Sequence, residues 1–266
     1  MDIQNEKKHL AEAFFQSLMK KNSHAPLVDY GLPGPFIYSR KKLLILSVKL
    51  GLHLRKNSHS QRIGIILPPG LAGTIANLAV LFAGKIPVNL NFSLGSNIAE
   101  NLIQKAEIKT VISATKMINK FPDFPWTDDL FEISTWLQKI SLTPYRLIKE
   151  AILLQFPYQL ARFLLKIPSK IDSEEATLLF TSGSSGEPKG VVLTHQNILS
   201  NCSQINRLGL FDKDAKILAN LPLFHSFGFT VSTCFPLLYN IPFVTVPSPL
   251  DVKSGLHAIQ KERITF

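Results

Sequence analysis

The sequence predicts an α/β fold in which layered parallel or mixed sheets carry flanking helices. Two β-prone runs, Arg62–Leu67 and Lys85–Leu90, are separated by the apolar, helix-like run Leu71–Ala83. Strand–helix–strand at this spacing is typical of a βαβ crossover and therefore of a parallel sheet. Hydrophobic residues make up 45% of the 266-residue chain, so the chain can bury a large core and is not of the disordered class.

The region around this unit predicts further helices and one more strand. An amphipathic helix is expected over residues 5–21, and Ser39 is placed to cap a second helix over 40–56. A third helix over 96–106 leads into a strand over 110–113. Residues 114–140 look irregular, whereas 145–167 predict one or two very apolar helices, bent or split at Pro157.

The second part of the chain begins with a strand–loop–strand pattern. Strands are expected at Leu178–Phe180 and Val191–Leu193, then a helix from His195 to Gly209 and a strand over 215–219. Residues 217–250 carry no charge, counting His225 as neutral, and contain five prolines. We expect loops and buried strands there. The uncharged run 63–84 is predicted to be buried α/β structure and not a membrane span, because Pro-Pro-Gly interrupts it.

Charge and cysteine content limit which partners and which cellular compartment we expect. A net charge of +10 favours polyanions. No nucleic-acid motif accompanies it, so we expect no nucleic acid and consider an acidic carrier protein or an anionic membrane. Cys202 and Cys234 have no metal-ligand spacing and form no disulfide framework, so we expect two buried thiols. The absence of a signal peptide after Met1 predicts a cytoplasmic location.

The loop between the two expected strands has the chemistry of a polyphosphate site. Glycines allow positive φ and leave room for a ligand, hydroxyl groups donate hydrogen bonds, and Lys189 adds a positive charge. The residues in question are Thr181, Ser182, Gly183, Ser184, Ser185, Gly186 and Lys189. A Gly/Ser-rich surface turn would have the same composition. The loop is not a Walker A motif, because Gly190 follows the lysine and the chain then continues as a strand.

The full string Thr181-Ser182-Gly183-Ser184-Ser185-Gly186-Glu187-Pro188-Lys189-Gly190-Val191-Val192-Leu193-Thr194-His195 resembles the phosphate-binding signature of the adenylate-forming (AMP-binding) enzymes. This resemblance implies binding of ATP with Mg²⁺ through the seven residues named above. It also implies that Thr181 reaches the metal ion or the AMP phosphate. The structure is then expected to be the N-terminal part of the adenylate-forming fold.

A second block, Leu221-Pro222-Leu223-Phe224-His225-Ser226-Phe227-Gly228, is also similar to this family. The resemblance implies that His225 lines an acyl pocket beside the nucleotide, with Phe224 and Gly228 as neighbours. By itself, a lone histidine between aromatic residues is more often a packed core side chain. A third block, Leu78 to Asn91, resembles an early structural core motif of the family.

The details of these blocks resemble the acyl-acyl carrier protein synthetase half of bifunctional 2-acylglycerophosphoethanolamine acyltransferases. The run Ile86-Pro87-Val88-Asn89-Leu90-Asn91 has Asn where many adenylate-forming enzymes have an acidic Asp-Pro step, and Pro247-Ser248-Pro249-Leu250 follows the second block. The resemblance implies activation of a fatty acid to an acyl-adenylate. The acyl group then passes to acyl carrier protein or CoA and feeds lysophospholipid reacylation.

Later blocks of the family do not occur within these 266 residues. They are the adenine and metal block, the ribose-binding aspartate and the C-terminal domain with the catalytic lysine. We therefore expect 1–266 to be a partial AMP-binding domain, with 1–170 as a first lobe and 171–266 as the phosphate-loop and acyl-pocket segment. We expect it to be incomplete and inactive alone, and the last residues, Glu262 to Phe266, look like the interior of a strand.

Three alternatives stay open. The chain could be a non-catalytic nucleotide- or acyl-binding fragment or a degenerate copy of such an enzyme. His24 and Asp29 match the His-x4-Asp spacing of acyltransferases. We expect this match to be chance, because a six-residue pattern with only two fixed positions is weak. Residues 145–167 could pack on the body of the protein or lie in a membrane interface.

Overall fold

Four parallel strands form the sheet that the βαβ pattern predicted. The computed structural model describes residues 8–20, 27–31, 35–171, 174–181 and 188–266. Within them the sheet has the order β4 (Ile86–Asn89), β3 (Arg62–Ile66), β5 (Thr110–Ser113) and β6 (Asp129–Glu132). The crossovers contain α3 (Leu71–Phe82) and α4 (Ser96–Lys105). Strand β3 pairs in parallel with both β4 and β5, so the predicted parallel sheet is confirmed.

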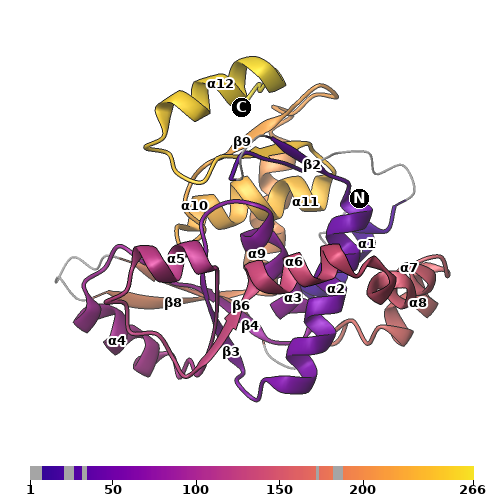
Figure 1. Ribbon diagram of the computed structural model, residues 1–266. Coiled ribbons are helices and arrows are strands. Elements are labelled where there is room, and N and C mark those ends of the chain that lie inside the picture. Colours follow the sequence, from indigo (N-terminus) through magenta and orange to yellow (C-terminus); the bar gives the residue numbers. More distant parts are fainter. Residues whose placement is uncertain (1–7, 21–26, 32–34, 172–173, 182–187) are drawn as a thin grey trace.

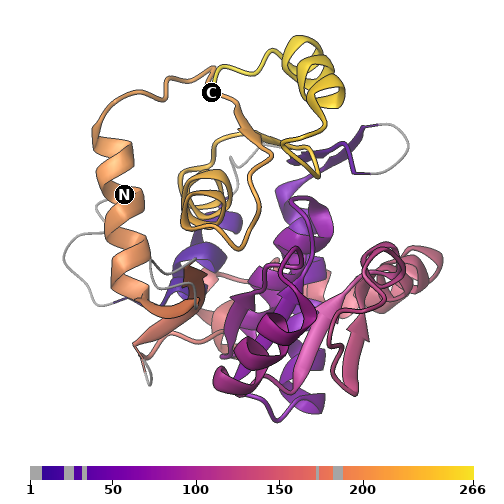
Figure 2. The ribbon, with the colours of Figure 1, turned by 90° about the vertical axis from the view of Figure 1, so that its left-hand side faces the viewer.

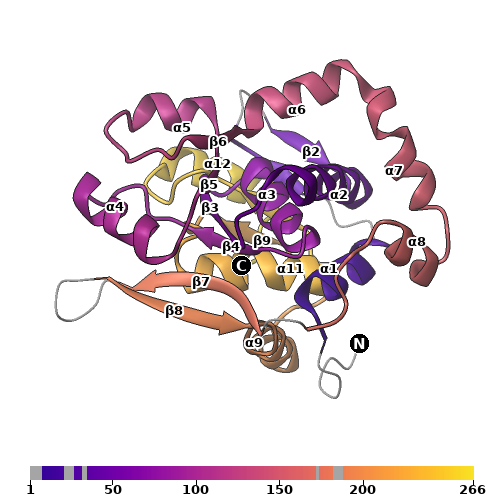
Figure 3. The same cartoon turned by 90° about the horizontal axis from the view of Figure 1, so that it is seen from below.

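The main core lies where α3 packs against α2 (Arg40–Asn57) (Figure 3). Helix α2 begins as predicted, because the Ser39 hydroxyl accepts the Lys42 N–H at 3.2 Å. Gly51 lets the two helices approach closely: a Cβ there would lie 2.9 Å from the Ala79 carbonyl oxygen. Helix α3 is buried on nearly every side, which explains why its sequence has no polar face.

The irregular structure expected for residues 114–140 is wrong. The region contains α5 (Thr115–Lys120), strand β6 and α6 (Ile133–Leu142). Glu132 ends the strand and caps α6, because its carboxylate accepts N–H groups from Thr115, Ser134 and Thr135 at 2.6–3.0 Å. Burial raises the pKa of Glu132, but these hydrogen bonds outweigh it and bring the pKa to about 2. None of these three short elements has a long run of periodic apolar residues, which is the pattern that predicts a helix or strand.

A second sheet joins the two ends of the chain. Its order is β2 (Phe36–Tyr38), β1 (Leu27–Asp29), β10 (Phe243–Thr245) and β9 (Ile217–Ala219). Strand β1 runs parallel to β10 and antiparallel to β2. Figures 1 and 2 show that this sheet lies apart from the first one, with α12 (Val252–Glu262) beyond it.

The loops and strands expected over residues 217–250 are only partly confirmed. Strands β9 and β10 are present, but between them the chain forms α10 (Ser226–Phe229), a π-helical turn (Thr230–Cys234) and α11 (Phe235–Tyr239). Pro236 lies in the first turn of α11, where its missing N–H costs no helical hydrogen bond. Asn240 ends the helix in a left-handed conformation with φ 61°.

Arg40 fixes the C-terminal end of α11 to the N-terminal helices. Its buried guanidinium donates to the carbonyl oxygens of Pro236 and Leu237. The hydroxyl of Ser17, on α1 (Leu10–Leu18), donates to the Leu237 and Leu238 carbonyls at 2.8 and 2.9 Å. Burial lowers the pKa of Arg40 to about 10. These donors pair helix-end carbonyls that would otherwise be buried without a partner.

The predicted helix pair around Pro157 is confirmed. A 3-10 turn (Pro144–Leu147) leads into α7 (Ile148–Leu153), and α8 (Tyr158–Leu164) begins after the proline. Figure 3 shows both helices on the outer edge of the molecule. Helices α7 and α8, like the others in the described ranges, are too short or too polar to cross a membrane. Both cysteines are buried free thiols, as expected.

Residues 264–266 run beside β9. The Leu218 N–H donates to the Phe266 carbonyl at 2.7 Å, and the Thr265 N–H donates to the Lys216 carbonyl at 3.1 Å. The strand expected over Glu262 to Phe266 is wrong: Glu262 ends α12, Arg263 is left-handed with φ 53°, and residues 264–266 pair beside β9 without being assigned as a strand.

Candidate nucleotide and acyl site

The strand–loop–strand pattern forms an antiparallel hairpin of β7 (Glu175–Thr181) and β8 (Lys189–Thr194). Its register places Thr181 directly opposite Lys189. Both side chains are exposed, and the Thr181 hydroxyl lies 3.5 Å from the Lys189 carbonyl oxygen. The hairpin therefore brings one predicted hydroxyl donor and the one predicted cation together. Residues 182–187, which include Ser182, Gly183, Ser184, Ser185 and Gly186, lie outside the described residues.

The first sheet supports the base of the hairpin. The buried Thr177 hydroxyl donates to the Pro87 carbonyl on β4 at 2.6 Å. At the other end Gly190 faces the side chains of Leu178 and Phe180, and a Cβ there would lie 3.2–3.3 Å from them. The hairpin is thus attached to the βαβ unit, and β7 and β8 lie at one edge of the molecule (Figure 3).

Helix α9 (His195–Arg207) follows β8 without a linker. Thr194 and Asn197 form a capping box: each side chain accepts the backbone N–H of the other residue at 3.0 Å. The capping box fixes the point where the second strand of the hairpin becomes a helix.

Two buried histidines connect this point to the N-terminal helix. The rings of His9 and His195 lie 3.9 Å apart between centroids. His9 caps α1 by accepting the Ala11 N–H, and His195 Nδ1 accepts the Leu10 N–H. Burial, with a smaller contribution from His195, lowers the pKa of His9 to about 3. His9 therefore packs in its neutral form, which becomes costly to maintain in acid.

We expect His9→Asn to make the chain less sensitive to acid. Because folding lowers the pKa of His9 from 6.5 to about 3, the unfolded state binds the proton first, and stability falls as pH drops below 6.5. Asn keeps the helix cap without titrating. At pH 5 the parent chain should lose about 1–2 kcal/mol more than the variant, relative to pH 7. Urea unfolding at both pH values measures this difference. His257→Asn, which removes an exposed histidine, should behave like the parent; equal acid loss in His9→Asn would refute the prediction.

The second predicted block forms a turn and the first helical residues after β9. His225 is the N-cap residue of α10 and its side chain is exposed, whereas Gly228 and Phe229 are buried. A Cβ on Gly228 would lie 2.2 Å from the Pro222 carbonyl oxygen and 2.8 Å from that of Leu221. Only glycine fits there, so Gly228 acts by letting the helix pack onto the turn that presents His225.

Phe224 joins His225 to the first sheet through an aromatic row. Its ring lies 4.7 Å from the His225 ring and 5.4 Å from that of Phe92, which it meets edge-on. Phe92 also contacts Phe121 at 5.2 Å. Phe92 was not among the predicted site residues, although it directly follows the block Leu78 to Asn91. The hairpin and the His225 turn thus both contact the β4 region, through Thr177 and Phe92 respectively.

Asn89, a polar residue of the early block, has a structural partner. Its side-chain amide exchanges two hydrogen bonds with that of Asn77 on α3, at 2.8 and 3.1 Å, and both residues are buried. Each buried side-chain amide thus has a partner for its oxygen and for one of its N–H groups, in place of water. It ties α3 to the end of β4.

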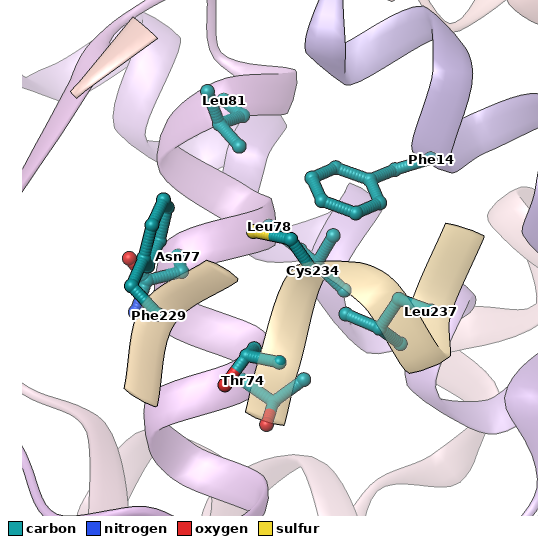
Figure 4. Close-up of a pocket in the computed structure, with 9 residues that line it drawn as sticks. Phe14, Thr74, Asn77, Leu78, Leu81, Phe229, Cys234 and Leu237 are labelled. Atoms are coloured by element: carbon teal, nitrogen blue, oxygen red, sulfur yellow. The ribbon is translucent and has the colours of Figure 1, made fainter. Parts of the chain in front are cut away.

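A small cavity lies between α1, α3 and the segment that runs from Phe229 to Leu237 (Figure 4). Helix α1 contributes Phe14, and α3 contributes Thr74, Asn77, Leu78 and Leu81. The remaining lining residues, from the segment that continues α10, are Phe229, Thr233, Cys234 and Leu237. Burial raises the pKa of the Cys202 thiol nearby to about 12 and that of the Cys234 thiol well above its ordinary value, so both thiols are unreactive. The cavity separates Thr233 and Cys234 of the π-helical turn from the side chains of α3.

Both carboxylate oxygens of Asp29 accept hydrogen bonds that hold the fold together. One carboxylate oxygen accepts the Leu71 N–H at the start of α3 at 2.9 Å, and the other accepts the Thr245 hydroxyl at 3.0 Å. Asp29 is 5% exposed. Its partner in the acyltransferase alternative, His24, lies outside the described residues.

The profile of the AMP-binding enzyme family matches residues 19–266. The chain belongs to this family. The match covers the hairpin, the His225 turn and both sheets. It confirms the resemblance to the family, which is the basis of the site prediction.

Relatives of the chain include fatty-acid-activating enzymes. It is 28% identical over 249 residues to a long-chain-fatty-acid–CoA ligase of Bacillus subtilis, covering 84% of this chain and 44% of the ligase. It is also 28% identical over 208 residues to an anguibactin system regulator of Vibrio anguillarum, covering 77% of this chain and 18% of that protein. The chain thus spans less than half the length of these relatives.

Solved structures confirm the fold. The o-succinylbenzoate CoA synthetase of Bacillus subtilis, solved with ATP and magnesium ion, superposes with a TM-score of 0.70 at 17% identity. The match covers 96% of this chain and 62% of the synthetase. The predicted class, the N-terminal part of the adenylate-forming fold, is therefore confirmed. The roles of Thr181, Lys189, Phe224, His225 and Gly228 stay predictions.

Proposed function

We propose that this chain supplies the nucleotide- and acyl-binding part of an enzyme that activates a fatty acid with ATP. The carboxylate of the acid attacks the α-phosphorus of ATP, the bond to the β-phosphate oxygen breaks, and pyrophosphate leaves. The product is an acyl-adenylate. A thiol then attacks the acyl carbonyl and releases AMP.

The observation that carries this proposal is the Thr181–Lys189 pairing at the end of the hairpin. An exposed hydroxyl beside an exposed cation fits a polyphosphate, whose charge grows on the β- and γ-phosphates as pyrophosphate departs. We assign phosphate binding to these two residues together with Ser182, Gly183, Ser184, Ser185 and Gly186. Mg²⁺ would neutralise phosphate charge, and Thr181 is the described residue we assign to it.

We assign the acyl group to the surface formed by His225, Phe224 and Gly228. The exposed imidazole lies at the end of the aromatic row formed with Phe224 and Phe92. An apolar wall with one polar group at its mouth is typical of sites for amphipathic ligands such as fatty acids.

Acyl carrier protein is our choice of acceptor, with CoA as the second candidate, and lysophospholipid reacylation is the process we propose it feeds. The support is the resemblance of the blocks around residues 86–91 and 221–250, and the +10 charge, which suits an acidic carrier. We divide the chain into a first lobe over 1–170 and a phosphate-loop and acyl-pocket segment over 171–266. We place it in the cytoplasm, with peripheral contact to the inner face of a membrane through residues 145–167.

Fatty-acid-dependent ATP–pyrophosphate exchange tests the proposal. The native protein is captured from its source cells with an antibody against residues 1–266, and its mass is recorded by immunoblot. We expect exchange of labelled pyrophosphate into ATP that requires both a fatty acid and Mg²⁺. Binding of ATP without any exchange would favour the second candidate, a non-catalytic nucleotide- or acyl-binding protein. Acyl transfer without ATP, lost in His24→Ala, would instead revive the acyltransferase alternative.

A further inference from the structure

A band of large apolar side chains faces solvent along α7, α8 and the turns beside them. Leu142 and Phe163, near its two ends, are 76% and 74% exposed. Apolar side chains that only pack a core are not exposed to this extent. A run of such exposed side chains therefore marks an interaction surface. The band consists of Leu142, Tyr145, Ile148, Ile152, Leu160 and Phe163.

Helical spacing places these residues on the outward side of each helix. Ile148 and Ile152 are four residues apart on α7, and Leu160 and Phe163 are three apart on α8, so each pair shares one face. The inward faces are occupied by other residues: Glu150 on α7 is 1% exposed, and Ala161 on α8 is fully buried. Figure 3 shows both helices at the rim of the molecule, with no other helix or strand drawn outside them.

The same segment is strongly basic. Residues 139–170 contain six cationic side chains and one carboxylate, so this segment supplies half of the +10 net charge. The carboxylate, Glu150, turns inward to Lys49 at 3.1 Å. Lys139, Arg146 and Lys149 are exposed beside the apolar band.

We propose that this band, named here the α7–α8 surface, binds an anionic lipid bilayer. Apolar side chains would enter the acyl region while the neighbouring cations meet lipid phosphates, as in interfacial helices. Helices of six and seven residues lie on a membrane and do not span it. A second copy is a poor occupant, because a two-fold interface would place this basic surface against itself.

This inference deepens the proposed function by naming the partner surface that brings the chain to a source of fatty acids. Its test needs neither ATP nor acyl transfer, so the two proposals fail separately. If the chain floats with vesicles but shows no pyrophosphate exchange, the membrane-binding proposal stands and the proposed enzyme activity is refuted. The opposite result would retain the enzyme alone.

Vesicle flotation of the 266-residue chain tests the α7–α8 surface. Vesicles are made from phosphatidylcholine alone or with added phosphatidylglycerol. We expect flotation with the anionic vesicles and a reduction of about tenfold or more in the bound-to-free ratio for Ile152→Ser/Phe163→Ser. Arg146→Gln/Lys149→Gln should weaken binding to anionic vesicles about tenfold and remove its salt dependence in part. Because all four side chains are exposed, the variants should fold like the parent, which circular dichroism checks.

Leu250→Ser/Leu256→Ser is the matched control. These two leucines are 89% and 62% exposed, just before and on α12, which lies away from α7 and α8 (Figure 1), and their loss should leave flotation unchanged. Equal flotation of the parent and Ile152→Ser/Phe163→Ser would overturn the proposal. So would equal binding to neutral and anionic vesicles, or a lipid-free dimer that Ile152→Ser/Phe163→Ser dissolves.

Discussion

Replacing Lys189 by alanine is expected to slow fatty-acid-dependent pyrophosphate exchange by about a hundredfold or more. The ammonium group is the one cation that the hairpin register places opposite Thr181. Its charge is needed most when negative charge builds up on departing pyrophosphate, so the rate should suffer more than fatty-acid affinity. The measurement is exchange rate against fatty-acid concentration in the native-length protein.

Lys109→Ala is the control for this prediction. Lys109 is an exposed lysine just before β5, so its loss changes net charge equally but removes no group from the hairpin. We expect its exchange rate to match the parent. An unchanged rate in Lys189→Ala would remove Lys189 from the phosphate site, and a loss of fatty-acid affinity alone would assign it to the acyl pocket.

Replacing Gly228 by alanine is expected to destabilise the chain by about 3 kcal/mol or more. The new methyl group would meet backbone atoms of Leu221 and Pro222, the nearest at 2.2 Å, and backbone in a packed turn cannot move aside as a side chain can. Urea unfolding of the chain measures the loss. In native-length protein that still folds, the displaced turn should also weaken fatty-acid affinity.

Gly255→Ala is the matched control, because Gly255 is also a buried helical glycine. Nothing lies within 4 Å of the position its Cβ would take. Alanine favours a helix over glycine by up to about 1 kcal/mol, so this variant should be as stable as the parent or more so. If Gly228→Ala unfolds at the same urea concentration as the parent, the close packing of α10 on the turn is wrong.

Strands β3 and β4 and the helix α3 between them were predictable because their residues are almost uniformly apolar, whereas β6 was missed. Residues Arg62 to Leu90 contain a buried strand, a buried helix and a second buried strand, with Pro68 and Gly84 marking the breaks. Each break follows from backbone chemistry. The helices split at Pro157 were found on the same ground.

The region 226–239 was missed because burial removed its helical pattern. Phe229, Phe235 and Leu237 are at most 1% exposed, so no polar face remains to reveal a period of 3.6 residues. Prolines at 222 and 236 suggested loops, yet Pro236 occupies the first turn of α11, where it is tolerated. Local propensity could not distinguish these cases without the tertiary packing.

Candidate site residues could be named where residue types and their order suggest a chemistry, and their roles stay predictions. Lys189 and Thr181 were identified by composition and order, and the hairpin register then explains their pairing. Phe92 could not be identified in this way, because an isolated Phe after a strand is usually core. Its role depends on Phe224, which is distant in sequence and meets it only in the folded chain.

The second sheet constrains how the chain can fold during its synthesis. All strands of the first sheet lie within residues 62–132, so that sheet can assemble while later residues are still being made. Strand β1 must wait, because its parallel neighbour β10 is far along the chain: Asp29 and Thr245 are bonded across 216 residues. Until β10 leaves the ribosome, one edge of β1 stays open to wrong pairing. Slow maturation of the second sheet, and dependence on chaperones that shield its edge, follow from this topology.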